Sequence, residues 1–195
     1  MRFARKGRWA LVLAALCSSL ALAQDRPQLC AACHGTGGNS TSPLTPSIAG
    51  QPKTFLEQQL ILFREGVRPS GQMAPVVKGM RDVEIVKLAE YFAKQPAKSM
   101  ESGPADSKRL RHGQAVSDKL RCASCHGATY GGQAQIPRLA GQREAYLEAE
   151  MRAYRDGRRA GGDTIMAAAL YGVSDADISA LAHFLSRNSA RAPAR

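Results

Sequence analysis

Two pentads of one pattern, Cys30-Ala-Ala-Cys33-His34 and Cys122-Ala-Ser-Cys125-His126, constrain this chain more than any other feature. Cysteines three positions apart project from the same side of one helical turn, so both thiols can form thioethers to the vinyl groups of one porphyrin. The histidine that follows then lies beneath the ring as an axial iron ligand. The pentads therefore predict two covalently attached haem c groups, held by Cys30, Cys33, Cys122 and Cys125, with His34 and His126 as metal ligands.

Three other uses of paired cysteines fit the sequence less well. A thioredoxin-like redox pair requires an alternation of strands and helices, and no such alternation is present. A zinc site could combine cysteines and histidines, but a histidine immediately after the second cysteine is poorly placed for tetrahedral ligation. A disulfide suits an exported protein, yet a bridge across two intervening residues stabilises a fold very little.

The N-terminus predicts a secretory signal peptide over residues 1–23. Basic residues are followed by an apolar run at positions 9–22 and by Ala21-Leu22-Ala23, which has small residues at the positions that a signal peptidase requires. The alternative is an uncleaved anchor, but the run is shorter than the roughly 20 residues of a membrane span. Cys17 belongs to the apolar run. These features indicate export to the periplasm, where c-type haem is attached.

Cleavage would leave four cysteines, all of them in the pentads, so no thiol remains for a disulfide or a nucleophile. It would also lower the formal net charge from +11 to +7, because the leader contains four basic residues and no acidic one. A basic surface favours an acidic redox partner. The basic residues are scattered and match no nucleic-acid-binding motif, so we expect no nucleic-acid partner.

The chain is an internal repeat. Residues 46–68 and 137–159 align without a gap and are identical at nine of 23 positions. Residues 95–107 contain two prolines and a glycine and lack apolar periodicity, which is typical of a linker. We predict an all-α fold of two tandem cytochrome c-like domains at residues 24–96 and 107–190, joined by a linker at residues 97–106 and followed by a tail at residues 191–195.

Each repeat has the pattern of a few helices joined by long loops. A first helix carries the pentad, and a middle helix is predicted from about residue 54 to 65 and again from about 143 to 156, with apolar residues on one face. Gly66 and Gly157 mark the ends of these helices. Ser174 is the expected N-cap of the last helix. Arg81 occupies the equivalent position in the first repeat, so Asp82 is the expected cap there.

The sixth iron ligand is expected to be a methionine. Its soft thioether sulfur favours the ferrous state and closes the iron to exogenous ligands. Met73 and Met166 occupy equivalent loop positions, 39 and 40 residues after His34 and His126, and are the predicted ligands. Met80 and Met151 are expected to fill the core, although Met80 remains the chief alternative to Met73. Met100, in the linker, is expected at the surface.

Pro46 and Pro137 follow the two ligand histidines by 12 and 11 residues. Each carbonyl is placed to accept the Nδ1–H of its histidine, which would fix the imidazole and raise its basicity. His112 and His183 have no counterpart in the other repeat. We expect both to be ordinary surface or boundary residues rather than ligands.

These motifs together resemble the dihaem cytochrome c4 family. The shared pattern is Cys-x-x-Cys-His-Gly, Pro-x-(Ile/Leu)-Ala-Gly-Gln, Phe/Tyr-Leu, Phe/Tyr-Arg-x-Gly, Met and a final Ile-x-x-Leu-Ala helix, over nearly all of residues 28–188. The resemblance implies His–Met ligation at both irons. It also implies electron transfer in the periplasm towards a haem-copper terminal oxidase, from a donor such as a cytochrome bc1-type complex, with membrane-surface association only through partners.

The first repeat departs from the second before its pentad. Six residues separate the predicted cleavage site from Cys30, so we expect a shorter leading helix there than before Cys122.

The expected function is an electron carrier rather than an enzyme. The alternative is the electron-accepting cytochrome subunit of a periplasmic dehydrogenase, such as a sulfide-oxidising flavocytochrome. A dihaem peroxidase is disfavoured because it needs an open iron site and a longer chain.

Overall fold

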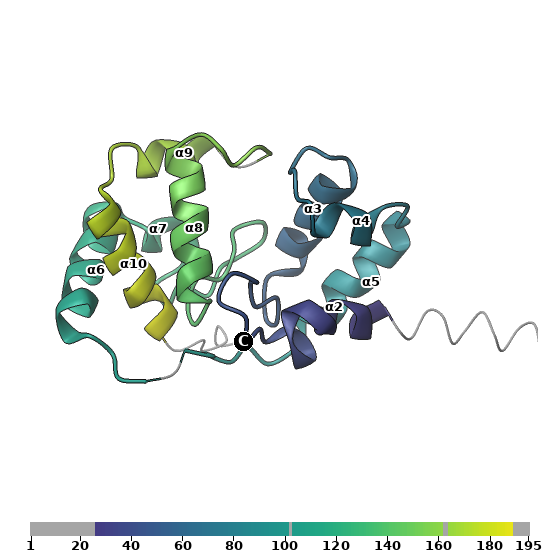
Figure 1. Ribbon diagram of the computed structural model, residues 1–195, viewed down its shortest axis with the longest axis horizontal. Helices are drawn as coiled ribbons and strands as arrows, with labels where there is room; N and C mark the ends of the chain where they lie inside the picture. The colour runs from purple at the N-terminus through teal and green to yellow at the C-terminus, as the bar shows by residue number, and fades with distance from the viewer. Residues whose placement is uncertain (1–25, 102, 162–163, 189–195) are drawn as a thin grey trace, which may run out of the picture.

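The computed structural model describes residues 26–101, 103–161 and 164–188 and shows two helical halves that lie side by side (Figure 1). The predicted signal peptide and the tail at residues 191–195 lie outside these residues. In the described part of the chain, the β structure is limited to an isolated bridge between Gln133 and Ile136. The prediction of an all-α fold is confirmed.

The first half consists of helices that surround one apolar cluster. They are α2 (Arg26–His34), the 3₁₀ turn η1 (Thr36–Gly38), α3 (Lys53–Arg64), α4 (Met73–Val77) and α5 (Asp82–Ala93). Helix α3 packs against both α4 and α5. The predicted middle helix is therefore present, and Gly66 ends it with a positive φ of 68°.

The second half repeats this plan with one further helix. Its elements are α6 (Ser107–Lys119), α7 (Ala123–His126), α8 (Glu144–Arg155), α9 (Thr164–Leu170) and α10 (Asp175–Arg187). Helix α10 packs between α6 and α8. As predicted, Gly157 follows α8 with a φ of 66°, and the Ser174 hydroxyl accepts a hydrogen bond from the backbone N–H of Asp177, 3.1 Å away.

Three local predictions differ from the structure. Helix α6 ends at Lys119, Arg121 has a φ of 56°, and the second pentad lies in a separate short helix, α7, with Cys122 at its N-cap. Met73 and Met166 lie in the short helices α4 and α9 rather than in loops. Asp82 is the first residue of α5, and the Glu84 carboxylate caps the helix by accepting the backbone N–H of Arg81 at 2.8 Å.

The largest helix contact is the crossing of α6 over α10, and Gly113 makes it possible. A Cβ at Gly113 would lie 2.1 Å from the carbonyl oxygen of Ala180 and 2.6 Å from Cβ of Phe184. The helix backbones therefore meet directly. In the first half, Val86 and Tyr91 of α5 are exposed, whereas their counterparts in α10, Ser179 and Phe184, are partly buried. Among the described residues, α2 contacts α5 much less than α6 contacts α10.

The segment between the halves is held by hydrogen bonds to both of them. The backbone N–H of Lys98 donates to the Asn39 side chain at 2.8 Å, and the Ser99 hydroxyl donates to the Ser186 carbonyl at 3.2 Å. Arg143 donates to the carbonyl oxygen of Met100 at 2.8 Å. Met100 is half-buried rather than fully at the surface. In its described residues, 97–101 and 103–106, the predicted linker is thus a strap that is bonded to both halves.

Among the described helices, none is by itself both long and apolar enough to cross a membrane. The pair α9 and α10 reaches that length and composition together, but the two helices are bent by 117° relative to each other.

Candidate haem sites

Both pentad histidines are oriented in the same way by a proline carbonyl. Nδ1 of His34 lies 2.8 Å from the carbonyl oxygen of Pro46, and Nδ1 of His126 lies 2.9 Å from that of Pro137. The predicted hydrogen bonds are therefore present in both halves. Since Nδ1 carries the donated proton, the Nε2 lone pair of each ring is free to bind a metal.

Burial keeps these imidazoles neutral. His34 and His126 are both buried, and desolvation lowers the pKa of each ring, while the hydrogen bond to the proline carbonyl partly opposes that shift. A neutral, oriented imidazole is the form that ligates iron.

The four pentad cysteines are unpaired and fall into two classes. Cys30 and Cys122 are half-buried, whereas Cys33 and Cys125 are exposed. Cys30 packs against the apolar cluster of the first half, and Cys122 packs against the equivalent cluster of the second. Each pair therefore lies where a flat apolar group could be bound between the cluster and the surface, as covalent haem attachment requires.

The predicted thioether ligands lie beside these same clusters. Met73 packs against the cluster that Cys30 contacts, and Met166 against the cluster that Cys122 contacts. Both side chains are partly buried. Met80 and Met151 are members of the buried cores, as the core-filling prediction expects, and the choice of Met73 over Met80 as the ligand stays a prediction.

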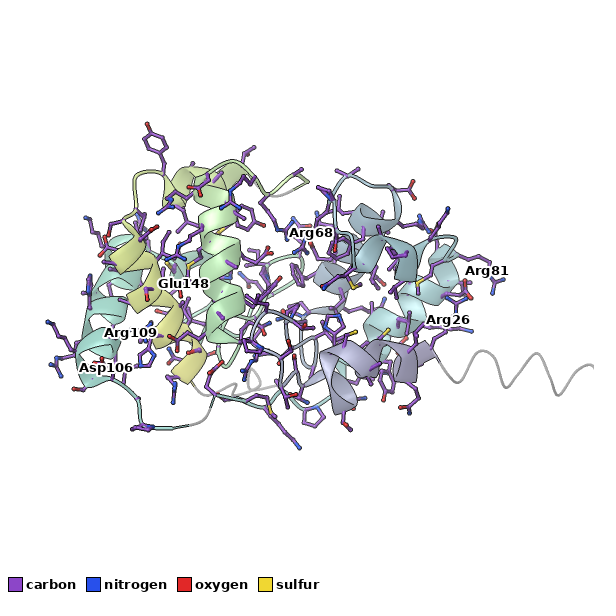
Figure 2. All side chains as sticks on the ribbon, viewed as in Figure 1. Arg26, Arg68, Arg81, Asp106, Arg109 and Glu148 are labelled. Carbon is purple, nitrogen blue, oxygen red and sulfur yellow. The ribbon has the colours of Figure 1, made fainter. Side chains whose placement is uncertain are left out.

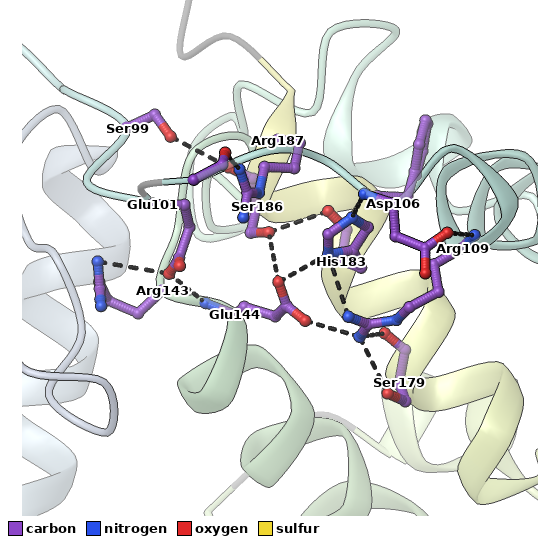
Figure 3. A network of polar contacts seen from close by, with 12 residues as sticks. Ser99, Glu101, Asp106, Arg109, Arg143, Glu144, Ser179, His183, Ser186 and Arg187 are labelled. Carbon is purple, nitrogen blue, oxygen red and sulfur yellow. Dashed lines mark hydrogen bonds and ion pairs between the residues drawn. The ribbon is translucent and has the colours of Figure 1, made fainter.

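The two remaining histidines lie away from the pentads. His112 is exposed and pairs with Asp177 at 2.7 Å, as expected for a surface residue. His183 differs from the expectation, because it is only 3% exposed. Its ring contacts the Glu144 carboxylate at 2.8 Å and accepts the backbone N–H of Asp106 at 3.1 Å (Figure 3). It joins the strap to α8 and α10, which is a structural role.

The two halves meet through reciprocal hydrogen bonds between equivalent residues. The Gln51 side chain donates to the backbone carbonyl of Arg138 at 3.0 Å and accepts its N–H at 2.9 Å. The Gln142 side chain makes the same two bonds with the backbone of Ser47, at 2.8 and 2.7 Å. Because Gln51 aligns with Gln142 and Ser47 with Arg138, the interface has pseudo-twofold symmetry.

A second reciprocal set lies further along the interface. Arg68 bonds Gln59 of its own half at 2.7 Å and Glu150 of the other at 3.1 Å. Its equivalent, Arg159, bonds Glu150 at 2.5 Å and Gln59 at 3.1 Å. Figure 2 shows Arg68 at the boundary between the halves.

Sequence reasoning identified the pentads and the prolines but missed these interface residues. The available signal was that the glutamine is identical in both copies of Pro-x-(Ile/Leu)-Ala-Gly-Gln. That identity marked a shared role, but it did not indicate that each glutamine would bond the other repeat.

Comparison with known proteins agrees with this geometry. The family described as Cytochrome c matches residues 110–189, and the family described as Cytochrome C oxidase, cbb3-type, subunit III matches residues 24–92. Cytochrome c4 of Thiocapsa roseopersicina is 33% identical over 165 residues, which cover 80% of this chain and 85% of that protein. The chain belongs to the cytochrome c4 family.

A solved cytochrome c4 structure has the same fold. The reduced recombinant protein from Pseudomonas stutzeri superposes with a TM-score of 0.76 at 28% identity, covering 87% of this chain and 97% of that one. A thiosulfate dehydrogenase electron acceptor of Thiomonas intermedia is also similar, with 32% identity over 179 residues, 86% of this chain and 82% of that protein.

Membership of the cytochrome c4 family confirms three predictions. The chain carries two covalently attached haem c groups at its Cys-x-x-Cys-His motifs. It is an electron carrier rather than an enzyme, and it works with redox protein partners. Its two halves are the two cytochrome c domains of this family.

Proposed function

We propose that this cytochrome carries single electrons in the periplasm, from a donor such as a cytochrome bc1-type complex towards a haem-copper terminal oxidase. We further propose His34 and Met73 as the axial ligands in the first domain and His126 and Met166 in the second. Each haem iron supplies a one-electron ferric–ferrous couple when bound. The observation that carries the proposal is the equivalence of the two sites, since both have a proline-oriented imidazole and a methionine beside the same apolar cluster.

The haem-binding residues suit an electron carrier because they are held in place, so that little would rearrange when the iron gains or loses an electron. The carbonyls of Pro46 and Pro137 hold the imidazoles in one orientation. A thioether from α4 or α9 would leave no position for an exogenous ligand and would favour the ferrous state. The exposed Cys33 and Cys125 bring each haem attachment to the surface, where electrons can enter and leave.

We propose the mature organisation that the sequence predicts. Residues 1–23 are removed on export. Domains at residues 24–96 and 107–190 are joined by the strap at residues 97–106, and residues 191–195 form a tail. The mature charge of +7 favours association with acidic partners by electrostatic steering, and contact with the membrane surface occurs only through those partners.

The proposal is tested by the rate at which the reduced holoprotein is oxidised. We expect rapid oxidation by membranes that contain a haem-copper oxidase, inhibition by cyanide, and a rate that falls as ionic strength rises. A periplasmic fraction should contain the mature protein, with an N-terminus at Gln24. Oxidation no faster than in oxidase-free membranes would contradict the role in respiration.

The similarity to a thiosulfate dehydrogenase electron acceptor favours a second candidate, an electron-accepting subunit of a periplasmic dehydrogenase. The ferric holoprotein would then be reduced by a thiosulfate- or sulfide-oxidising dehydrogenase faster than by a bc1-type complex. Comparing the two reduction rates under the same conditions distinguishes the candidates.

A further inference from the structure

Arg138 lies on the pseudo-twofold axis between the two domains. Its side chain donates from Nη2 to the carbonyl oxygen of Ala49 at 3.0 Å and from Nη1 to that of Ala140. Ala49 and Ala140 are equivalent residues of the two repeats, so the guanidinium bridges the same point in both. The equivalent of Arg138 itself is Ser47, and the axis therefore carries one cation.

This cation is buried without a compensating charge. Arg138 is 4% exposed, and its Nε has no hydrogen-bond partner. No carboxylate among the described residues lies within 4.0 Å of the guanidinium, and burial alone lowers its pKa to about 10. The side chain is still charged at neutral pH, and a buried unpaired charge is strongly unfavourable.

Three other arginines that have one buried nitrogen without a hydrogen-bond partner lie beside an anion. Arg143, Arg152 and Arg159 each have one nitrogen without a partner. Each of them nevertheless lies close to a carboxylate, at 3.4 Å from Glu101, 2.7 Å from Glu148 and 2.5 Å from Glu150, respectively. Arg138 thus differs from these three arginines in having no carboxylate beside it among the described residues.

The segments that hold Arg138 also border both haem sites. Pro137, its neighbour, orients His126, and Pro46 of the facing segment orients His34. Leu139 and Ile48, one residue before the two bonded alanines, pack on the clusters that Cys122 and Cys30 contact. The guanidinium thus lies between the two haem sites. Each haem c has two propionate carboxylates, on the edge of the ring opposite the thioether bonds.

We infer that the Arg138 guanidinium is the shared counter-ion of a propionate from each haem, and that it raises both reduction potentials. A cation beside a propionate cancels negative charge that would otherwise stabilise the ferric iron. It therefore favours the ferrous state of both haems. The inference depends on the two attached haems and not on the partner proteins, so a failed oxidase assay would leave it standing.

The test is a potentiometric titration of the Arg138→Gln holoprotein, followed optically. Both potentials should fall, so that at a fixed ambient potential the ferric-to-ferrous ratio of each haem rises about tenfold, which is about 59 mV for a one-electron couple. Resonance Raman spectra should show a shift of the propionate bending modes at both haems. Arg143→Gln, which removes a buried arginine already paired with Glu101, should change neither ratio more than about twofold.

Two results would overturn the inference. One is an Arg138→Gln protein with two haems, unchanged reduction potentials and unchanged propionate modes, which would mean that the guanidinium only bridges two backbone carbonyl oxygens. The other is a reduction potential that falls at one haem only, which would mean that the guanidinium does not serve both haems. If the glutamine variant does not incorporate both haems, Arg138→Lys replaces it. Because lysine keeps the charge, the ferric-to-ferrous ratio of each haem at a fixed ambient potential should then stay within about threefold of the parent value. The propionate bending modes should still shift, and modes like those of the parent would refute the contact.

Discussion

Replacing a proposed methionine ligand by leucine tests whether its sulfur is the sixth ligand of the iron, and other methionines of the chain serve as controls. Leucine resembles methionine in size but has no sulfur, so Met73→Leu and Met166→Leu should each open one iron without disrupting packing. We expect the reduced form of each variant to bind one carbon monoxide per chain and the thioether–iron charge-transfer absorption of the ferric form to halve. Carbon monoxide titration and near-infrared spectra measure these changes.

Met80→Leu and Met151→Leu are the controls for this experiment, because both side chains lie in the buried cores. They should cost less than about 1.5 kcal/mol and leave both irons closed to carbon monoxide. Carbon monoxide binding by the Met80 variant and not by the Met73 variant would reassign the ligand of the first domain to Met80.

Glu144 gives a pH-dependent contribution to stability. Burial raises the pKa of this carboxyl, but hydrogen bonds from His183 and Arg109 outweigh burial and hold the pKa below its usual value. The contribution is therefore present above the unfolded pKa of about 4.3 and is lost as the pH falls through the lower folded value. Glu144→Gln should cost about 1–3 kcal/mol at pH 7.

Thermal unfolding at several pH values measures this effect. The difference in Tm between the parent and Glu144→Gln should be largest near neutral pH and should shrink below about pH 4. Glu148→Gln, which removes a surface pair with Arg152 on the same helix, should change Tm much less. A difference that does not vary with pH would contradict the ionic role of Glu144.

Residue-level predictions succeeded where the chemistry is local. The Pro46 and Pro137 carbonyls could be predicted because a fixed spacing from a ligand histidine recurs in both repeats. The buried state of His183 could not, since its partners Glu144 and Asp106 lie 39 and 77 residues away along the chain. Arg138 could not be recognised as a buried cation for the same reason.

At the scale of helices, the crossing of α6 over α10 depends on the absence of a side chain at position 113. Gly113→Ala would place a Cβ against the backbone of Ala180, which cannot withdraw without moving the helix. We expect a loss of about 1–3 kcal/mol and a Tm lower by several degrees. Gly71→Ala is the control, because a Cβ there meets nothing within 4 Å. Equal stability of the two variants would contradict the close crossing.

Helices with a regular apolar period were predicted to within one or two residues, and those without one were not. Helices α3 and α8 each bury one side, so the spacing of Leu56 and Leu60 or Leu147 and Met151 was sufficient. The break at Arg121 was missed, since nothing in its chemistry requires a positive φ. Helices α4 and α9 are too short for periodicity to show.

At the scale of the whole molecule, the sequence predicted two copies of one unit but not how they meet. A repeat specifies equivalent residues, and it is the fold that decides whether those residues face one another. Here they do, and Gln51 and Gln142 each satisfy the backbone of the opposite domain. The interface is thus made of polar groups that water would otherwise solvate, and its stability depends on every group having a partner.

This dependence predicts the behaviour of a double variant. Gln51→Leu with Gln142→Leu would leave the backbone N–H and C=O groups of Arg138 and Ser47 without their partners, at about 1–3 kcal/mol for each residue. We expect calorimetry of the parent holoprotein to show one cooperative transition, and that of the double variant to show two, because the domains no longer support each other. Gln114→Leu, at an exposed position of α6, should change stability by no more than about 0.5 kcal/mol. A single transition with the Tm of the parent in the double variant would mean that other contacts, such as the paired Arg68 and Arg159, hold the domains together.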